Sequence, residues 1–296
     1  MLLFLRILLG VTLIAIALAW WLSAPVTLDK SQMQALPEGN PEAGAMVFAA
    51  AGCGSCHTAP DAEPSGASIL SGGRRFPSPY GTFVAPNISP HPEHGIGDWS
   101  THDLAQAMWN GVSPDGQHYF PAFPYTSYAN ANLDDINDLN AYLKTLPASD
   151  RPNEPHDIGI PFSIRRGLGL WKQLYLRPGW IVETAGEPEL ERGRYLVEAL
   201  GHCAECHTPR TALGGLDRSA WLAGAPNPSG EGQIPGIRPD VLGWSAEDLA
   251  YYFESGFTPD FDSAGGHMAE VVENLAQLPP QDRAAIAAYL LALEGS

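Results

Sequence analysis

The residues best suited to chemistry in this chain stand together in the stretch AGCGSCHTAP, residues 51–60. Cys53 and Cys56 are separated by two residues, and His57 follows the second thiol directly. A redox dithiol needs only the two cysteines, so the adjoining imidazole requires an explanation of its own. The spacing C-x-x-C-H is the attachment signature of c-type haem. The two thiols would form thioethers with the haem vinyl groups, and the histidine would bind one axial face of the iron.

The same pattern returns in GHCAECHTPR, where Cys203 and Cys206 are followed by His207. The two motifs together use all four cysteines of the chain, which leaves no thiol for a disulfide or a separate zinc cluster. The sequence therefore predicts two covalently attached haem c groups, each with iron, and a zinc ribbon is the alternative.

The second axial ligand decides what each iron can do. Ligation by His and Met gives a high potential, whereas an open position lets the iron bind small molecules. In the second half, Met268 follows a glycine pair in a polar loop before the last helix, with His267 as a neighbouring competitor. A lone Met is usually core packing, but this polar setting favours ligation. We predict Met268 as the second ligand of the second iron.

The first iron has no equivalent methionine. An internal repeat with an offset of 145 residues places Phe123 where Met268 stands, and phenylalanine cannot bind iron. His118 aligns five residues before that position, so we predict His118 as the ligand. The alternatives are an open or water-bound iron, or ligation by Met108, Met46 or another histidine.

The repeat also shows which elements position these residues. WSTHDLAQAMWNGVSPDG, from Trp99, aligns without gaps on WSAEDLAYYFESGFTPDF, from Trp244. Each copy predicts a helix capped by serine, Ser100 or Ser245, and closed by glycine, Gly111 or Gly256. Helices are also expected before each haem motif and at the end of each half. The fold class predicted is all-α, with two haem domains at 36–147 and 186–296 joined by a Pro/Gly-rich linker at 148–185.

The amino-terminal segment, residues 1–24, is almost continuously apolar and carries a single charge, Arg6. About 20 such residues cross the hydrocarbon core as a helix, and Trp20 and Trp21 suit the far interface. We predict an uncleaved transmembrane anchor, with a removed signal peptide as the alternative. Arg6 keeps the amino terminus inside, so the remainder is exported and a bacterial inner-membrane protein with periplasmic haem domains is expected.

The chain is acidic, with 33 Asp and Glu against 16 Lys and Arg and a formal net charge of −17. Nucleic acid is an unsuitable partner because its phosphates would be repelled. A soluble basic partner is favoured, although an acidic surface can also serve solubility alone. The linker gathers Arg165, Arg166, Lys172 and Arg177. Their charges are either solvated or in contact with lipid headgroups.

Four stretches carry a resemblance to a known family: APNISPHPEHGIGDWS, DGQHYFPAFPYTSY, PHDIGIPFSIRRGLGLWK and MAEVVENLAQLPPQDRAAIAAYL. From about residue 36 onward the chain resembles the membrane-anchored dihaem cytochromes c that serve periplasmic alcohol, gluconate or molybdenum-type dehydrogenases as subunits or partners. The resemblance implies two class I cytochrome c folds and electron transfer from a dehydrogenase toward a soluble cytochrome c or terminal oxidase. In that family a Met often follows the PYTSY stretch, whereas this chain has residues 129–132, ANAN.

Two functions are compatible with these features. The first is an electron relay, which needs no catalytic acid, base or nucleophile. The second is a haem enzyme, peroxidase-like or oxidising a small molecule, that uses an open first iron. The sequence favours the relay.

Overall fold

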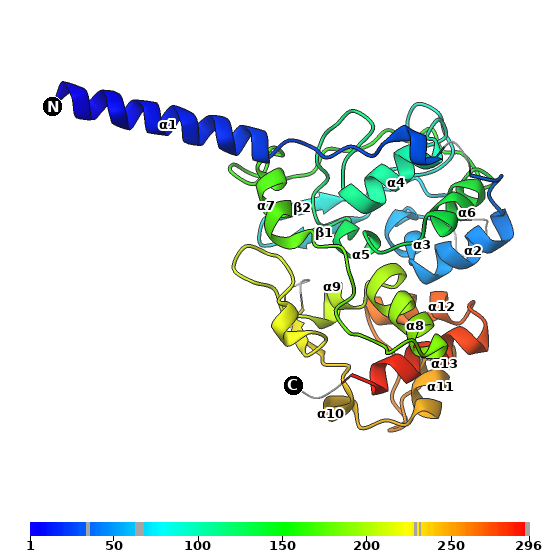
Figure 1. The fold of residues 1–296 in the computed structure, drawn as a ribbon. Coiled ribbons are helices and arrows are strands. Elements are labelled where there is room, and N and C mark those ends of the chain that lie inside the picture. Colours follow the sequence, from blue (N-terminus) through cyan, green and yellow to red (C-terminus); the bar gives the residue numbers. More distant parts are fainter. Residues whose placement is uncertain (34–35, 63–67, 228–229, 231, 294–296) are drawn as a thin grey trace.

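The computed structural model describes residues 1–33, 36–62, 68–227, 230 and 232–293. Figure 1 shows one long helix, α1 (Leu2–Leu22), projecting from a body made of two halves stacked one below the other. The predicted end of the second domain, residues 294–296, lies outside the described residues.

The regular elements of the first half are helices and one small sheet, joined by long loops. After the short turn η1 (Lys30–Met33), its elements are α2 (Pro41–Ala50), α3 (Cys53–His57), β1 (Arg75–Ser78), β2 (Gly81–Val84), α4 (Thr101–Asn110), α5 (Tyr125–Tyr128) and α6 (Leu133–Leu143). The connector to the second half contains α7 (Gly167–Tyr175).

The second half repeats this plan and adds one helix. Its elements are α8 (Pro188–Arg194), continued by the π-helical turn η2 (Tyr195–Leu200), α9 (Ala204–His207), η3 (Arg218–Ala220), β3 (Gly224–Pro226), β4 (Gln233–Pro235), α10 (Pro239–Leu242), α11 (Ala246–Ser255), α12 (His267–Leu275) and α13 (Pro280–Leu291). Helix α12 stands at the place that α5 takes in the first half.

Each half is closed by a crossing of its first and last helices, α2 with α6 and α8 with α13. Both crossings are made at a glycine. A Cβ atom on Gly44 would lie 2.0 Å from the backbone oxygen of Asp138, and one on Gly193 would lie 2.0 Å from that of Ala285. The helices approach this closely only because no side chain separates their backbones.

The caps predicted from the repeat are confirmed. The Ser100 hydroxyl accepts a hydrogen bond from the Asp103 amide, and Ser245 does the same with Asp248. In each case the aspartate accepts in return from the serine amide, which completes a capping box. Gly111 and Gly256 close the helices in the left-handed conformation.

The all-α prediction is corrected by two small antiparallel hairpins. Strand β1 pairs with β2, and β3 pairs with β4. The loop after each haem motif turns back on itself at Pro and Gly residues, and Gly81 adopts a φ of 125° at the first of these turns. Each hairpin lies between a haem motif and the helix that follows it, so the loops are folded rather than structureless.

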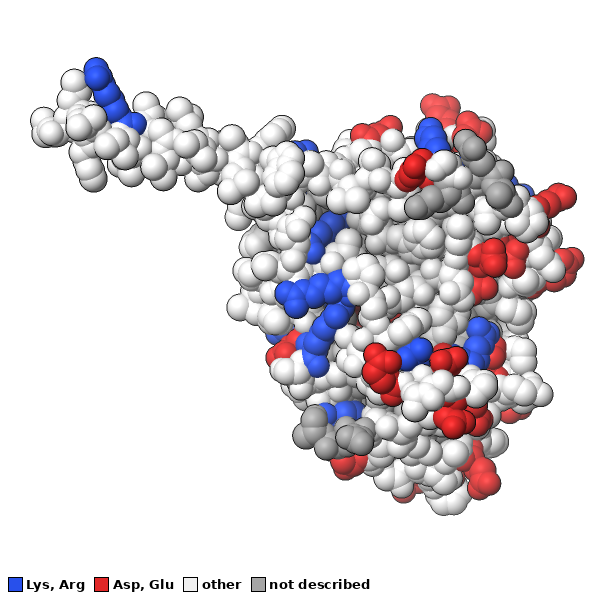
Figure 2. All heavy atoms as spheres, in the orientation of Figure 1, with Lys and Arg blue, Asp and Glu red and all other residues white. Residues whose placement is uncertain are grey.

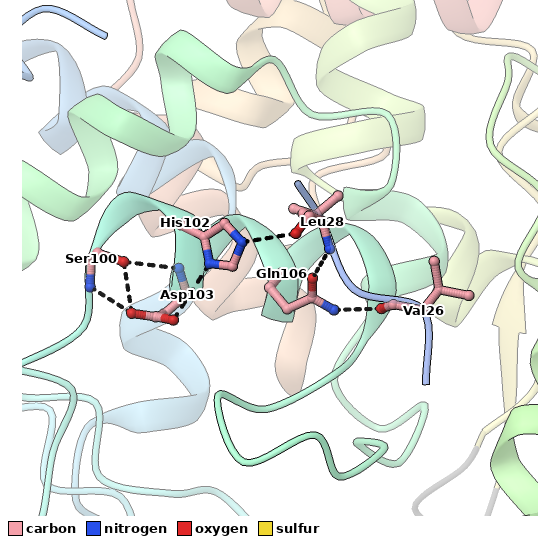
Figure 3. A network of polar contacts seen from close by, with 6 residues as sticks. All are labelled: Val26, Leu28, Ser100, His102, Asp103 and Gln106. Atoms are coloured by element: carbon pink, nitrogen blue, oxygen red, sulfur yellow. Dashed lines mark hydrogen bonds and ion pairs between the residues drawn. The ribbon is translucent and has the colours of Figure 1, made fainter. Parts of the chain in front are cut away.

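The segment that leaves α1 is bound along α4 (Figure 3). The Gln106 side chain accepts a hydrogen bond from the Leu28 amide at 2.6 Å and donates one to the Val26 carbonyl at 2.7 Å. A His102 ring nitrogen lies 3.2 Å from the Leu28 carbonyl oxygen. Gln106 is buried, and its amide pairs with the segment's backbone as a neighbouring strand would. The base of α1 is therefore fixed to the first half.

The close approach of the paired helices at Gly44 and Gly193 can be tested by substitution. Gly44→Ala and Gly193→Ala should each lower the free energy of unfolding by about 1–3 kcal/mol, because the added methyl group overfills a closed helix crossing. Denaturant unfolding followed by circular dichroism measures this. Gly159→Ala is the control, since nothing lies within 4 Å of a Cβ atom there. Equal stability of all three variants would contradict the close helix crossings at Gly44 and Gly193.

Candidate haem-binding sites

Each predicted haem motif forms one short helical turn. Cys53, Cys56 and His57 lie on α3, and Cys203 precedes α9, which holds Cys206 and His207. None of the four thiols is in a disulfide. Burial raises the pKa of Cys53 and of Cys203 to about 12. Reactive redox dithiols have a lowered thiol pKa, so the environment of these thiols differs from that of a redox dithiol.

The two histidines are held in the same way by backbone carbonyls. His57 Nδ1 lies 2.8 Å from the Pro86 oxygen, and His207 Nδ1 lies 2.8 Å from the Pro235 oxygen. Burial lowers the pKa of both rings, which favours the neutral imidazole. A neutral ring that donates from Nδ1 to a carbonyl presents the lone pair of Nε2 to a metal.

These carbonyls explain the position of the hairpins. Pro86 follows β2 closely, and Pro235 is the last residue of β4. Each hairpin thus brings a proline carbonyl back to the histidine of its own motif. Neither partner follows from the haem motif itself, although a proline stands 29 residues after His57 and 28 residues after His207. That recurring separation was the available signal.

The donor set fits haem c better than the zinc alternative. A structural zinc site requires four converging ligands. Within the described ranges, no group of three or more His, Cys, Asp or Glu side chains is arranged to hold a metal ion. Bound haem would supply an iron that accepts and releases single electrons. The residues of the chain would hold it by two thioethers and one oriented imidazole at each motif.

The structure places Met268 at the start of α12, as its second residue, rather than in the preceding loop. The side chain is half-buried and packs against the hydrophobic core of the body. Its backbone amide donates to the Gly265 carbonyl at 3.2 Å, so the glycine pair sets the turn into the helix.

His118 forms contacts at the base of α1. Its Nε2 is 2.9 Å from the Ser23 oxygen, and its Nδ1 is 3.0 Å from Lys172 Nζ. Both ring nitrogens are therefore occupied, and the ring is buried at the base of α1. This placement speaks against His118 as an iron ligand. The prediction rested on a small loop rearrangement, and the structure uses the ring to fasten α1 instead.

Lys172 completes the group around His118. Its Nζ lies 2.6 Å and 2.7 Å from the carbonyl oxygens of Asn110 and Gly111, besides the His118 nitrogen. Burial lowers the pKa of Lys172 to about 7. Three acceptors for three N–H donors, and the Tyr125 ring 4.7 Å away, favour the ammonium form.

The first haem motif is joined to the helix that carries Met268. The Arg74 guanidinium donates to the Ser55 carbonyl within α3 and to both carboxylate oxygens of Glu270 on α12, at 3.0 Å and 2.7 Å. Asn274 on the same helix donates to the Ser55 hydroxyl at 2.8 Å. Helix α12 of the second half therefore rests on the first motif.

The second motif is joined to the first half in turn. His202, directly before Cys203, has its Nε2 3.3 Å from the Ala51 oxygen, and its ring meets that of Tyr128 edge-on. The Thr126 hydroxyl donates to Glu205 at 3.0 Å. Each motif thus contacts the other half, so haems bound at these motifs would be neighbours.

Comparison with known proteins identifies two cytochrome c domains. The cytochrome c family model matches the chain twice, at residues 41–147 and 190–294. A dihaem cytochrome c-type protein of Cereibacter sphaeroides is 56% identical over 282 residues, which cover 95% of both chains.

Two further relatives are parts of dehydrogenases. The fructose dehydrogenase cytochrome subunit of Gluconobacter japonicus is 36% identical over 81% of this chain and 50% of its own length. The cytochrome c subunit of the quinone alcohol dehydrogenase of Gluconobacter oxydans is 34% identical over 90% of this chain. This chain spans 57% of that subunit. With two family matches and two complete C-x-x-C-H motifs, the chain belongs to the cytochrome c family, as a dihaem member with two covalently bound haem c groups.

Proposed function

We propose that the chain relays electrons from a periplasmic dehydrogenase to a soluble cytochrome c or a terminal oxidase. The observation that carries this proposal is the mutual contact of the two motifs, because electron transfer between haems requires that they lie close together. The relatives named as dehydrogenase cytochrome subunits support a dehydrogenase as the donor. Helix α1, with a mean hydropathy of 2.6 and no buried residue, would anchor the chain in the bacterial inner membrane.

The sites are proposed residue by residue. Cys53 and Cys56 carry the first haem, with His57 on its iron, and Cys203 and Cys206 carry the second, with His207. Met268 is proposed as the second ligand of the second iron. Its place at the start of α12, beside the core and fixed by Glu270 and Asn274 to the first motif, supports a rigid ligand position.

An electron relay requires no protein acid or base at either iron. Each motif holds the haem and fixes its imidazole, and the packing of the two halves keeps the pair at a constant separation. The acidic surface then draws a basic redox partner by long-range attraction.

A second candidate function uses an open first iron for small-molecule chemistry. The engagement of both His118 nitrogens favours this arrangement, since it removes the histidine that the sequence suggested as a ligand. An open iron in the reduced protein would bind CO, whereas two six-coordinate irons would resist it.

Replacing Met268 tests the second site. Met268→His should lower the potential of the second haem by on the order of 0.1 V, a fraction of the roughly 0.8 V that axial ligands control. A spectroscopic redox titration measures the shift. His267→Gln, at the neighbouring position, should leave the potential unchanged. A shift caused by His267→Gln instead would assign ligation to that histidine.

Replacing His118 tests the first site. His118→Gln should leave the spectrum and potential of the first haem unchanged, because its ring already serves Ser23 and Lys172. If the first iron is open, CO should bind one of the two haems in the reduced wild-type protein, and to the same extent in the variant. Newly acquired CO binding in the variant alone would show that His118 is the ligand after all.

Electron transfer to a basic partner should weaken with salt. The second-order rate constant for oxidation by a basic cytochrome c should fall about tenfold between low and physiological ionic strength, because salt screens the attraction. Stopped-flow absorbance measures the rate, and a small uncharged oxidant is the control. A rate constant that ignores ionic strength would rule out electrostatic docking on the acidic surface.

A further inference from the structure

The connector between the halves exposes an unusual number of large apolar side chains. Ile160 is 85% exposed, Ile164 is 56% exposed, and Phe162, Leu170 and Leu174 are between 40% and 49% exposed. Large apolar side chains that are exposed together on one segment mark a contact with a partner or a membrane. We call these five residues, together with Leu213, the apolar face. Leu213 is 60% exposed, and its carbonyl accepts a hydrogen bond from the Trp171 ring at 2.9 Å.

Helix α7 within this face exposes apolar side chains and buries a charged one, which is the reverse of a helix on a water-soluble surface. Its buried residues are Gly169 and the charged Lys172, while Leu170 and Leu174, one turn apart, point outward. In water the leucines would be covered and the lysine exposed. The arrangement indicates that something other than water covers the outer side of α7.

The charge around the apolar face is opposite to that of the chain as a whole. Residues 158–182 contain three arginines and the buried Lys172 but no Asp or Glu, in a chain with a net charge of −17. Figure 2 shows Lys and Arg gathered beside the base of α1, whereas most Asp and Glu lie on the opposite side and toward the lower end of the body. This cationic neighbourhood complements anionic phosphate groups.

The contact of α7 with α1 sets the position of the apolar face along the axis of α1. Arg166 donates to the Ser23 hydroxyl at 2.9 Å and to the Trp20 carbonyl at 2.6 Å, and its guanidinium lies 4.3 Å from the Trp20 ring centre. Gly169 fits against Ser23 so closely that a Cβ atom would lie 2.3 Å from the Ser23 oxygen. Because α1 has 21 residues, it is about 31 Å long and just spans the hydrocarbon core. Its end at Trp20 to Ser23 therefore lies at the interface, and α7 lies at the same level.

We propose that the apolar face is a second membrane contact, which lies in the headgroup region of the bilayer that α1 crosses. Its leucine, isoleucine and phenylalanine side chains enter the boundary of the acyl chains, and the arginines beside them meet anionic lipid phosphates. The contact holds the haem body in one orientation against the membrane. This inference rests on the proposed anchor and adds to it a surface and a lipid class.

The test uses the full holoprotein in nanodiscs that contain neutral and anionic phospholipid, without any dehydrogenase. Since the four native cysteines are taken up by haem, an introduced cysteine is the only free thiol. Phe162→Cys and Leu174→Cys should react about tenfold more slowly with a charged, water-soluble maleimide than Phe257→Cys, because lipid excludes the reagent. Phe257 is a matched control, with 54% exposure against 49% for the other two.

Replacing the anionic lipid with neutral lipid should speed the reaction at Phe162→Cys and leave that at Phe257→Cys unchanged. An unchanged rate at Phe162→Cys would contradict the role given to the arginines. Equal rates at the apolar face and at Phe257→Cys would overturn the membrane contact. Protection that appears only when a dehydrogenase is added would overturn it too, and would assign the face to that protein.

A further variant separates this inference from the anchor. Leu9→Cys lies in the middle of α1 and should be unreactive in the nanodisc. If Leu9→Cys is protected but the apolar face is not, the anchor stands and the second contact is wrong. If Leu9→Cys also reacts freely, the anchor fails and the second contact fails with it.

Discussion

The arrangement of this protein depends on the contact between its two haem motifs. Arg74 is the centre of that contact, since one guanidinium binds the carbonyl of Ser55 in the first motif and the carboxylate of Glu270 beside Met268. Bidentate pairs of this kind are directional as well as strong. On the other side, His202 and Glu205 of the second motif contact Ala51 and Thr126 of the first half. The two halves are therefore packed against each other through their haem motifs. Their motifs share a boundary, and a haem pair held there keeps a constant separation.

Hydrogen bonds also orient the two axial histidines and attach α1 to the first half. A hairpin in each half returns a proline carbonyl to the imidazole of its motif, which selects the ring nitrogen that faces the iron. His118 and Arg166 form hydrogen bonds with Ser23 at the end of α1. Lys172 in turn contacts the other ring nitrogen of His118. If α1 crosses the bilayer as proposed, this attachment sets where the body lies relative to the bilayer. Donor and acceptor would then approach from the periplasmic side of an oriented molecule.

Much of this could be predicted from local patterns. The capping boxes at Ser100 and Ser245 follow from serine and aspartate three residues apart, and the haem motifs follow from their covalent chemistry. The crossings at Gly44 and Gly193 could not be predicted, because a glycine within a helix shows its purpose only when the partner helix is placed. The contacts of His118 could not be predicted for a related reason. Its offset in the repeat indicated the iron, but its partners Ser23 and Lys172 come from segments that the repeat does not contain. The hairpins were missed because Pro- and Gly-rich loops carry little periodicity.

Low-temperature electron paramagnetic resonance during a redox titration tests the central contact most directly. In the fully oxidised protein both irons are paramagnetic, whereas in the half-reduced protein a low-spin ferrous partner is diamagnetic. Neighbouring haems would broaden each other's signals, so the remaining ferric signal should sharpen when the first electron enters. A ferric signal with the same line shape in both states would show that the irons are far apart and would contradict the account.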